Sequence, residues 1–559
     1  MAVHRSALLG EYANPPLWKW TVDTSDQIDA VQVSVNGGPY RSLHAAARSF
    51  RPPRPLAPGV HRLTVRVTTS GAFAGTVEGE AAGRVAALPA PVPVPDDPCY
   101  PAAGVRPACG GAATAAGQWP LRHLRLPELW QALDGGVLGE PGPVVVAVLD
   151  TGYASHPDLA SNLDTAAGYD FVSHASAAGD GDGIDPDATD PGTGGSWHGT
   201  TIAGVIAART GNGAGVAGMG WPWAGSRITI MPVRIAGRFG ATSYDVAQGL
   251  RYAAGLANDS GEVPPVPAKI INLSLAEAVP GPRDEVLEEA LHAVAAAGAI
   301  VVAAAGNHGS AVRAPATSPN TLAVGSVTLA GTLADESNFG PRIDVVAPGG
   351  TESVGVPALG VGAGAGPARW IVRSDHGTSI AAAHVSGVLA LLAGFDRSLT
   401  LGAARALLAD AAIDLGPPGR DDRYGPGLLD AFALFGVTRG HPPALGGRDP
   451  AAAGGPAGGS SAPGSAAAAR PGRGADPHAL IVRYRHRGMN YAARTAAGEL
   501  LRARHAVARV EAGAAGFALV QLQDGEDREQ VQARLEADPA VAAVYDNRIS
   551  LPAVPPPTQ

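Results

Sequence analysis

Continuous apolar runs dominate the middle of the chain. Residues 144–149 and 300–305 consist almost entirely of Val, Ile, Leu and Ala, which is typical of parallel strands covered on both faces. A polar residue follows each run, Asp150 after the first and Asn307 after the second. In open α/β sheets the functional site lies at the carboxyl ends of the strands. The pattern therefore predicts an α/β unit with a parallel sheet and a site at one edge.

Two further runs of small and apolar residues predict buried helices. His198 opens the first run, and Ser379 stands near the start of the second, in the sequence Gly-Thr-Ser-Ile-Ala-Ala-Ala-His-Val-Ser-Gly. A helix N-terminus favours negative charge, and small neighbours let a substrate backbone come close. Taken singly, such a serine is also a common helix cap, and a histidine on an Ala-rich helix is commonly a packed side chain. The functional interpretation depends on all these groups occurring together and in order.

The order Asp150, His198, Ser379, with Asn307 before the serine, resembles that of the subtilisin-like serine proteases, the subtilases. The resemblance covers about residues 118–437. It implies an α/β subtilisin-like catalytic domain with a parallel sheet in a three-layer arrangement. Supporting motifs in the same order are found at residues 118–121, 271–275, 337–340, 346–349 and 424–431.

The resemblance implies a role for each of these four residues. Ser379 would be the nucleophile of a serine endopeptidase, and His198 would take its proton and later give it to the leaving amine. Asp150 would hold the imidazole in the required tautomer. Asn307 would donate its side-chain amide to the oxyanion, together with the backbone N–H of Ser379. The chemistry would need no cofactor, and an acyl-enzyme would form on a protein or peptide substrate.

The resemblance also implies a substrate-binding set. Where the family commonly has Ser-Leu-Gly, this chain has an alanine in the third position, and we expect its methyl group to narrow the entrance of the pocket for the side chain before the cut. A self-processing maturation protease for one partner and a catalytically silent fold used for binding stay open as alternatives. The implied substrate-binding residues are Ser274, Leu275, Ala276, Ala304, Ala305 and Gly306.

An acidic loop lies between Asp150 and His198. Its carboxylates are separated by Gly and Pro, and a Ca²⁺ ion takes six to eight oxygen ligands. The loop does not have the spacing of an EF-hand, and a solvated turn-rich loop is the alternative. Subtilases often carry calcium, so we expect a structural Ca²⁺ here. The candidate ligands are Asp180, Asp182, Asp185, Asp187 and Asp190.

Charge and composition limit the possible partners and locations. The formal net charge is −9, which argues against nucleic-acid binding. Outside the small-residue runs no stretch of eighteen apolar residues occurs, so we expect no membrane span. The first ten residues lack the apolar core of a signal peptide. The residues alone leave open whether Cys99 and Cys109 form a disulfide; the resemblance favours one, and with it a secreted or periplasmic location over a cytoplasmic one.

The segment before the resemblance predicts strands. Apolar residues alternate with polar ones around residues 17–22, 31–35 and 63–67, and Asn36-Gly37 is a hairpin signal. Short alternating strands are typical of an immunoglobulin- or fibronectin-like β-sandwich, which we place at residues 1–92. Such a domain could bind substrate, glycan or a partner, or act as a spacer. A connecting segment with the two cysteines follows at residues 93–140.

The region after the catalytic domain, placed at residues 141–437, changes character. Residues 438–477 are mostly Gly, Ala, Pro and Ser, which predicts a flexible linker. A second folded segment follows at residues 478–559. Its patterns predict strands and helices in the order β-α-β-β-α-β, a ferredoxin-like α+β domain. The predicted elements are residues 479–484, 491–506, 507–510, 517–522, 527–535 and 541–545.

This C-terminal domain resembles the propeptide of the subtilases, an inhibitor that normally precedes the protease. The resemblance rests on residues 538–546, Asp-Pro-Ala-Val-Ala-Ala-Val-Tyr-Asp. It implies a tethered folding aid and inhibitor whose tail lies in the substrate cleft. Residues 441–477, about 37 residues, have a root-mean-square span of roughly 33 Å as a flexible chain, enough to reach around a domain. Cutting within the linker would release the inhibitor, and an oligomerisation or partner-binding module is the alternative.

Overall fold

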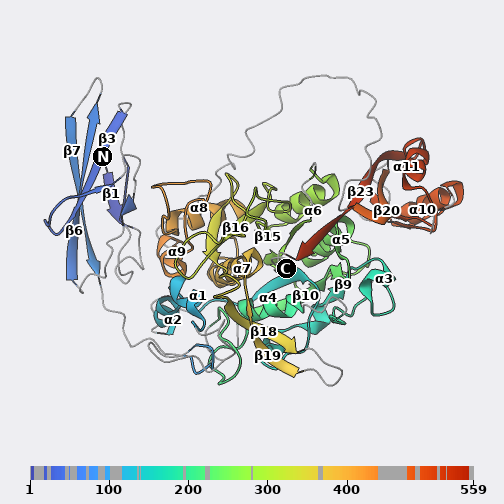
Figure 1. Cartoon of the computed structure of the whole chain (residues 1–559), viewed down its shortest axis with the longest axis horizontal. Coiled ribbons are helices and arrows are strands. Elements are labelled where there is room, and N and C mark those ends of the chain that lie inside the picture. The colour runs from blue at the N-terminus through green and yellow to red at the C-terminus, as the bar shows by residue number, and fades with distance from the viewer. Residues whose placement is uncertain are drawn as a thin grey trace.

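A computed structural model covers the chain (Figure 1). We call residues 140–438 the central unit and residues 475–552 the C-terminal unit. The structure describes residues 2–5, 18–21, 27–43, 49–50, 59–70, 75–85, 95–100, 116–134, 138, 140–192, 197–220, 227–278, 281, 283–362, 369–438, 475–484, 491–505, 507–512, 517–523 and 526–552.

A parallel seven-stranded sheet forms the middle of the central unit, as the apolar runs predict. Its strands lie in the order β17-β16-β15-β13-β8-β10-β9, and all neighbouring pairs are parallel. The strands are β8 (Val144–Asp150), β9 (Tyr169–Asp170), β10 (Ile228–Arg234), β13 (Ile270–Leu273), β15 (Ile300–Ala304), β16 (Thr321–Val327) and β17 (Val345–Pro348).

Helices cover both faces of this sheet, which confirms the predicted three layers (Figure 1). Side chains alternate along β8: Val146 and Val148 belong to an apolar cluster with helices α4 and α7, whereas Ala147 and Leu149 belong to a second cluster with α5 and α6. Burial on both faces explains why the strand sequences are apolar without interruption. The helices are α4 (His198–Ala207), α5 (Ser243–Ala253), α6 (Glu285–Ala296) and α7 (Thr378–Phe395).

Helix α7 is the only helix of the described residues that is long and apolar enough to cross a membrane. Most of its length is buried inside the fold. Its side chains fill one of the two apolar clusters on the sheet. Its composition is therefore accounted for as that of a core helix.

Shorter elements surround this core. A strand hairpin, β18 with β19, packs beside α4, and two short strands, β12 and β14, lie free of the main sheet. These elements are α1 (Trp119–His123), α2 (Leu126–Asp134), α3 (Ala175–Ala178), β11 (Ala236–Gly237), β12 (Gly240–Thr242), β14 (Leu275–Glu277), β18 (Val356–Gly362), β19 (Arg369–Asp375), α8 (Leu401–Ala411) and α9 (Ala431–Thr438).

The C-terminal unit has the element order β-α-β-β-α-β. One face of its antiparallel sheet packs on its own helices, with Leu480, Val482 and Val520 in a separate apolar cluster. Most of the predicted linker, residues 439–474, lies outside the described residues. The elements are β20 (Ala475–Tyr484), α10 (Tyr491–His505), β21 (Arg509–Ala512), β22 (Phe517–Gln521), α11 (Arg528–Glu536) and β23 (Val541–Pro552).

The other face of the C-terminal sheet docks on the central unit beside α5 and α6 (Figure 1). Ala479, Ile481 and Leu519 join the apolar cluster that also holds Leu149 of β8. Strand β23 runs beyond its own unit and pairs antiparallel with β14 and β12 of the central unit. The predicted strand at residues 541–545 is therefore longer, because its far half finds partners in another unit.

The N-terminal segment forms two antiparallel sheets, which we call the N-terminal sheets. Their strand orders are β1-β2-β5 and β4-β3-β6-β7. At the predicted hairpin signal, Asn36 and Gly37 both have positive φ, 54° and 71°, as a type I′ turn requires. The strands are β1 (Ala2–Arg5), β2 (Trp18–Thr21), β3 (Gln27–Val35), β4 (Arg41–Leu43), β5 (Ser49–Phe50), β6 (Gly59–Ser70) and β7 (Gly75–Val85).

The connecting segment is described only in part. Cys99 is buried and disulfide-bonded, whereas Cys109 lies outside the described residues. Asp97 nearby accepts a hydrogen bond from the backbone N–H of Gly211 at 2.8 Å. The segment is therefore fastened to the central unit just before α1.

Candidate active site

Asp150 and His198 are hydrogen-bonded at the carboxyl edge of the sheet. The histidine Nδ1 lies 2.8 Å from both carboxylate oxygens of Asp150. Asp150 ends β8 and His198 begins α4, and both side chains are almost completely buried. A carboxylate that accepts from Nδ1 fixes the tautomer that leaves Nε2 as the basic nitrogen. The pair can therefore act as an oriented general base.

Gly199 explains how α4 starts so close to the end of β8. A Cβ at this position would lie 2.1 Å from the carbonyl oxygen of Gly152 and 3.2 Å from Cβ of Asp150. The backbone N–H of Gly199 donates to Oγ1 of Thr151 at 3.1 Å. Thr151 in turn donates to Asp190 at 2.8 Å. Gly199 therefore allows the start of α4 to lie close to the end of β8, and Thr151 holds it there. This brings His198 to Asp150.

A second carboxylate acts on His198 that the sequence patterns did not single out. Burial lowers the pKa of His198, but the charge and hydrogen bond of Asp150, helped by the charge of Asp375, outweigh it and raise the pKa overall. Asp375 ends β19, and Arg373 donates to it through Nε at 3.1 Å. The charge of Arg373 lowers the pKa of His198 and so opposes the effect of Asp375. Only the position of Asp375 four residues before Ser379 could have drawn attention to it.

Ser379 is the second residue of α7 and is buried. Its Oγ donates to the carbonyl oxygen of Ser274 at 3.1 Å, and the Ser274 hydroxyl donates to the carbonyl of Ser379 at 3.1 Å. Asn272 also bonds Oγ of Ser274 at 2.8 Å. The reciprocal bonds fix the start of α7 against the connection between β13 and β14.

Asn307 lies beside the start of α7. Its Oδ1 accepts from both the backbone N–H and the hydroxyl of Thr378, each at 2.9 Å. These bonds fix the orientation of the amide, with the nitrogen on the opposite side from Thr378. An amide held in this way is suited to donate to a developing oxyanion without reorganising.

The residues predicted to bind substrate lie along two facing segments. Leu275 and Ala276 are in β14, and Ala304 ends β15, with Ala305 and Gly306 directly after it. A Cβ built on Gly306 would lie 3.4 Å from Cβ of Ala276. The methyl group of Ala276 thus lies near the backbone of Gly306; that it narrows the entrance of the pocket stays a prediction.

Strand β23 lies along this substrate-binding edge. Pro552 pairs with Leu275, Leu551 with Ala276, and Ser550 with Glu277. On its other side Ser550 pairs with Ala241 of β12. A peptide strand held between two extended segments is a recurring mode of peptide recognition.

The predicted calcium loop has another organisation. Asp180 pairs with the buried guanidinium of Arg234, and Asp185 and Asp187 accept from backbone N–H groups two residues ahead. Asp190 is bonded to Thr151, and Asp182 is exposed. Among the described residues no group of three or more His, Cys, Asp or Glu is arranged to hold a metal ion. The calcium site stays a prediction that this loop geometry does not support.

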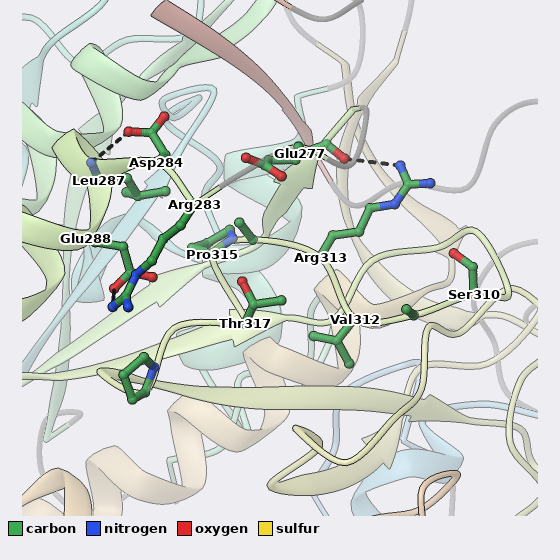
Figure 2. A pocket seen from close by; sticks show the side chains of 14 residues that line it. Glu277, Arg283, Asp284, Leu287, Glu288, Ser310, Val312, Arg313, Pro315 and Thr317 are labelled. Carbon is green, nitrogen blue, oxygen red and sulfur yellow. Dashed lines mark hydrogen bonds and ion pairs between the residues drawn. The ribbon is translucent and has the colours of Figure 1, made fainter. Parts of the chain in front are cut away.

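A cavity of about 480 Å³ opens beside the end of β14 (Figure 2). Glu277 and Arg313 lie at its rim, and Arg283 and Glu288 line it from the start of α6. Arg313 Nη1 donates to the main-chain carbonyls of Glu277 and Ala278, at 3.2 and 2.8 Å. The sequence patterns gave no sign of this cavity, because its walls come from segments about thirty residues apart.

The central unit is similar to known proteins. The sequence model of the subtilase family matches residues 142–427. An extracellular protease of Xanthomonas campestris is 37% identical over 306 residues, which are 52% of this chain and 50% of that protein. Subtilisin Savinase of Lederbergia lenta is 33% identical over 317 residues, which are 56% of this chain and 97% of that protein.

A solved structure is also similar. A protease of Pseudoalteromonas arctica has 33% sequence identity and a TM-score of 0.51, and the match covers 58% of this chain and 97% of that one. The chain spans about half the length of the Xanthomonas protein and of an extracellular basic protease of Dichelobacter nodosus, 50% and 52%. The match to the family model, residues 142–427, lies within the central unit.

Proposed function

Because the chain belongs to the subtilase family, we propose that it is a serine endopeptidase in which Ser379 attacks the peptide carbonyl. The observation that carries the proposal is the hydrogen bond between His198 and Asp150, at 2.8 Å. His198 takes the proton of Ser379 as the acyl-enzyme forms and returns it to the leaving amine. Asp150 stabilises the imidazolium, and Asn307 donates to the oxyanion.

Labelling with a fluorophosphonate probe tests this function. Such a probe reacts with an activated serine, so the full chain should be labelled and Ser379→Ala should not. In addition, His198→Ala should reduce the labelling rate at least a hundredfold, because the serine then lacks its base. Folded protein that is not labelled at Ser379 would contradict the proposal and favour a catalytically silent binding module.

We further propose that the C-terminal unit inhibits the enzyme within the same chain. The pairing of β23 with β14 and β12 supports this, because a substrate strand would need the same backbone groups. A substrate in this register places one residue opposite Ser274, whose carbonyl oxygen lies 3.1 Å from the hydroxyl oxygen of Ser379. Proteolysis within residues 439–474 would remove the tether and let the unit leave.

The proposed substrates are proteins or peptides bound as extended strands. Two relatives are named as extracellular proteases, and Cys99 is disulfide-bonded. Both observations favour a location outside the cytoplasm. No cofactor enters the proposed chemistry, because the base, nucleophile and oxyanion donor are all side-chain or backbone groups of this chain.

A further inference from the structure

Strand β23 is held at one more point before it reaches the serine. Arg548 of this strand forms an ion pair with Glu277, Nη1 to Oε1 at 3.0 Å. The side chain of Glu277 is 7% exposed and that of Arg548 is 18% exposed. A carboxylate so deeply buried needs a partner, because an unpaired buried charge is costly. The pair is therefore unlike the exposed ion pairs of most protein surfaces.

The space for the guanidinium is provided by Gly281. A Cβ on this glycine would lie 2.4 Å from Nη1 of Arg548 and 2.7 Å from Nη2. Gly281 and Glu277 both line the cavity beside β14. The guanidinium of Arg548 thus lies at the opening of the cavity, between the carboxylate of Glu277 and the backbone of Gly281.

Other carboxylates of the cavity are already engaged by the central unit. Asp284 accepts from the backbone N–H groups of Val286 and Leu287 at the start of α6, and Glu288 pairs with Arg283 at 2.9 Å. Arg313 donates to the main-chain carbonyl of Glu277, as Figure 2 shows, and also to that of Ala278. Glu277 is the carboxylate of this cavity that faces the incoming strand.

Backbone and side chain of Arg548 are bound in different ways. Its backbone N–H donates to Oγ of Ser243 at 3.2 Å, and that hydroxyl donates to Asp284 at 2.5 Å. Any residue except proline can make the bond to Ser243, since only the main chain takes part. Glu277, in contrast, contacts the side chain. Ser243 can therefore bind a strand of any sequence at this position, whereas Glu277 selects a strand with a positively charged side chain.

We propose that Glu277 and Gly281 form a specificity subsite that takes an arginine or lysine side chain of the substrate. The register fixes its place: Pro552 lies opposite Leu275, so Arg548 is five residues upstream of the residue that a substrate places opposite Ser274. The inference rests on the proposed endopeptidase function, because it reads β23 as a substrate strand. Preferred substrates carry a basic residue five positions before the residue whose carbonyl is attacked.

The test compares two fluorogenic peptides in the full chain. One has the sequence of residues 546–553, Asp-Asn-Arg-Ile-Ser-Leu-Pro-Ala, with a coumarin amide after the alanine; the other has Gln in place of the arginine. Because the docked C-terminal unit competes equally with both, the ratio of their kcat/KM values does not depend on the inhibited fraction. We expect a preference of about tenfold for the arginine peptide, as a charged hydrogen bond at a buried site gives.

Variants separate charge from space. Glu277→Gln removes the charge and Gly281→Ala fills the place of the guanidinium, so each should reduce the preference to about twofold or less. Glu262→Gln, in the exposed loop after α5, is the matched control and should keep the full preference. Equal rates for the two peptides in the unchanged enzyme, or an unchanged preference in Glu277→Gln, would overturn the inference alone.

The two proposals fail in distinguishable ways. If the fluorophosphonate probe labels Ser379 but neither peptide is hydrolysed, β23 does not lie in a substrate register and the subsite inference fails while the nucleophile stands. If the folded protein is neither labelled nor active, the proposed function fails and the inference with it.

Discussion

The C-terminal unit and the N-terminal sheets are both antiparallel structures attached to the same central unit, but among the described residues only the C-terminal unit shares an apolar cluster with it. Ile481 and Leu519 of the C-terminal unit belong to an apolar cluster of the central unit. The apolar cluster of the N-terminal sheets, around Val33 and Val65, contains only residues of these sheets within the part of the chain that the structure describes. Their strands likewise form sheets of their own, whereas β23 pairs with β12 and β14.

The difference teaches where control over the site can come from. Apolar contact gives the C-terminal unit its affinity, since burial contributes about 25 cal/mol per Å² of apolar surface. Strand pairing then directs that affinity onto the cleft. The N-terminal sheets have neither connection among the described residues, so we expect them to influence the chemistry little. Four predictions test this contrast, from the largest effect to the smallest.

Deleting residues 478–559 should have the largest effect. It uncovers both the cleft and the apolar face beside α5 and α6, so less enzyme should fold, and each folded molecule should hydrolyse peptides at least tenfold faster. The measurement is the hydrolysis rate per mole of probe-labelled Ser379. Deleting residues 1–92 is the comparison and should change this rate by less than twofold. If the chain without residues 478–559 folds in full yield and hydrolyses peptides at the rate of the full chain, the C-terminal unit controls the site no more than the N-terminal sheets do.

Ile481→Asn should release the C-terminal unit without unfolding it. Ile481 faces the central unit, whereas its neighbour Leu480 faces the unit's own helices. Loss of one buried isoleucine weakens docking by roughly tenfold or more, which should raise peptide hydrolysis by up to that factor. Leu480→Asn is the matched control, because it should unfold the unit itself, visible as lost protection in hydrogen exchange across β20 and β22. Equal hydrogen-exchange protection of β20 and β22 in the two variants would show that the two faces of the C-terminal sheet do not have separate roles.

Asp375→Asn should shift the pH profile of the enzyme. The charge of Asp375 helps raise the pKa of His198, and a base works only when it is unprotonated, so activity falls as the pH drops through that pKa. Without the charge the pKa decreases, and the acid limb of kcat/KM should move to lower pH by less than about one unit. When each profile is normalised to its plateau, the kcat/KM of the variant should exceed that of the unchanged enzyme by a few fold at pH values below the pKa of His198. Because Asp375 belongs to the central unit, the shift should persist after deletion of residues 478–559; a shift seen only in the full chain would contradict this.

Arg483→Gln should have the smallest effect. Arg483 pairs with Glu285 at 3.0 Å across the docked interface, and Glu285 is 59% exposed. Exposed ion pairs contribute about 0.2–1 kcal/mol, so docking should weaken by about fivefold at most, and the difference should vanish at high salt. Inhibition measured against salt concentration checks this. A salt-independent loss larger than that of Ile481→Asn would show that charge, rather than apolar contact, holds the unit.

The sequence predicts the site best where local pattern and position in the sheet coincide. Asp150 follows a doubly covered strand, and His198 and Ser379 stand at the starts of helices rich in small residues. Such signals need only a few neighbouring residues. The expected parallel sheet and its three layers are also confirmed. A strand that is buried on both faces is apolar at every position, so a short stretch of sequence is enough to indicate it.

Long-range pairing is what the sequence patterns could not predict. Asp180 of the acidic loop pairs with Arg234, a buried cation more than fifty residues away, which the local pattern of carboxylates does not indicate. The strand at residues 541–545 was expected to end early, and it continues to Pro552 because β14 supplies its neighbour. The salt bridge from Arg548 to Glu277 likewise joins positions whose separation carries no local signal.

The pairing of β14 with β23 has a consequence for the time course of synthesis. The ribosome makes the central unit before β23 exists, and about 100 residues separate the end of that unit from the start of this strand. At 5–20 residues per second, roughly 5–20 s pass between the two events. During that interval a nascent chain would carry a complete nucleophile and no cover. Any folding assistance that the C-terminal unit gives must therefore act late, on a chain that has already collapsed.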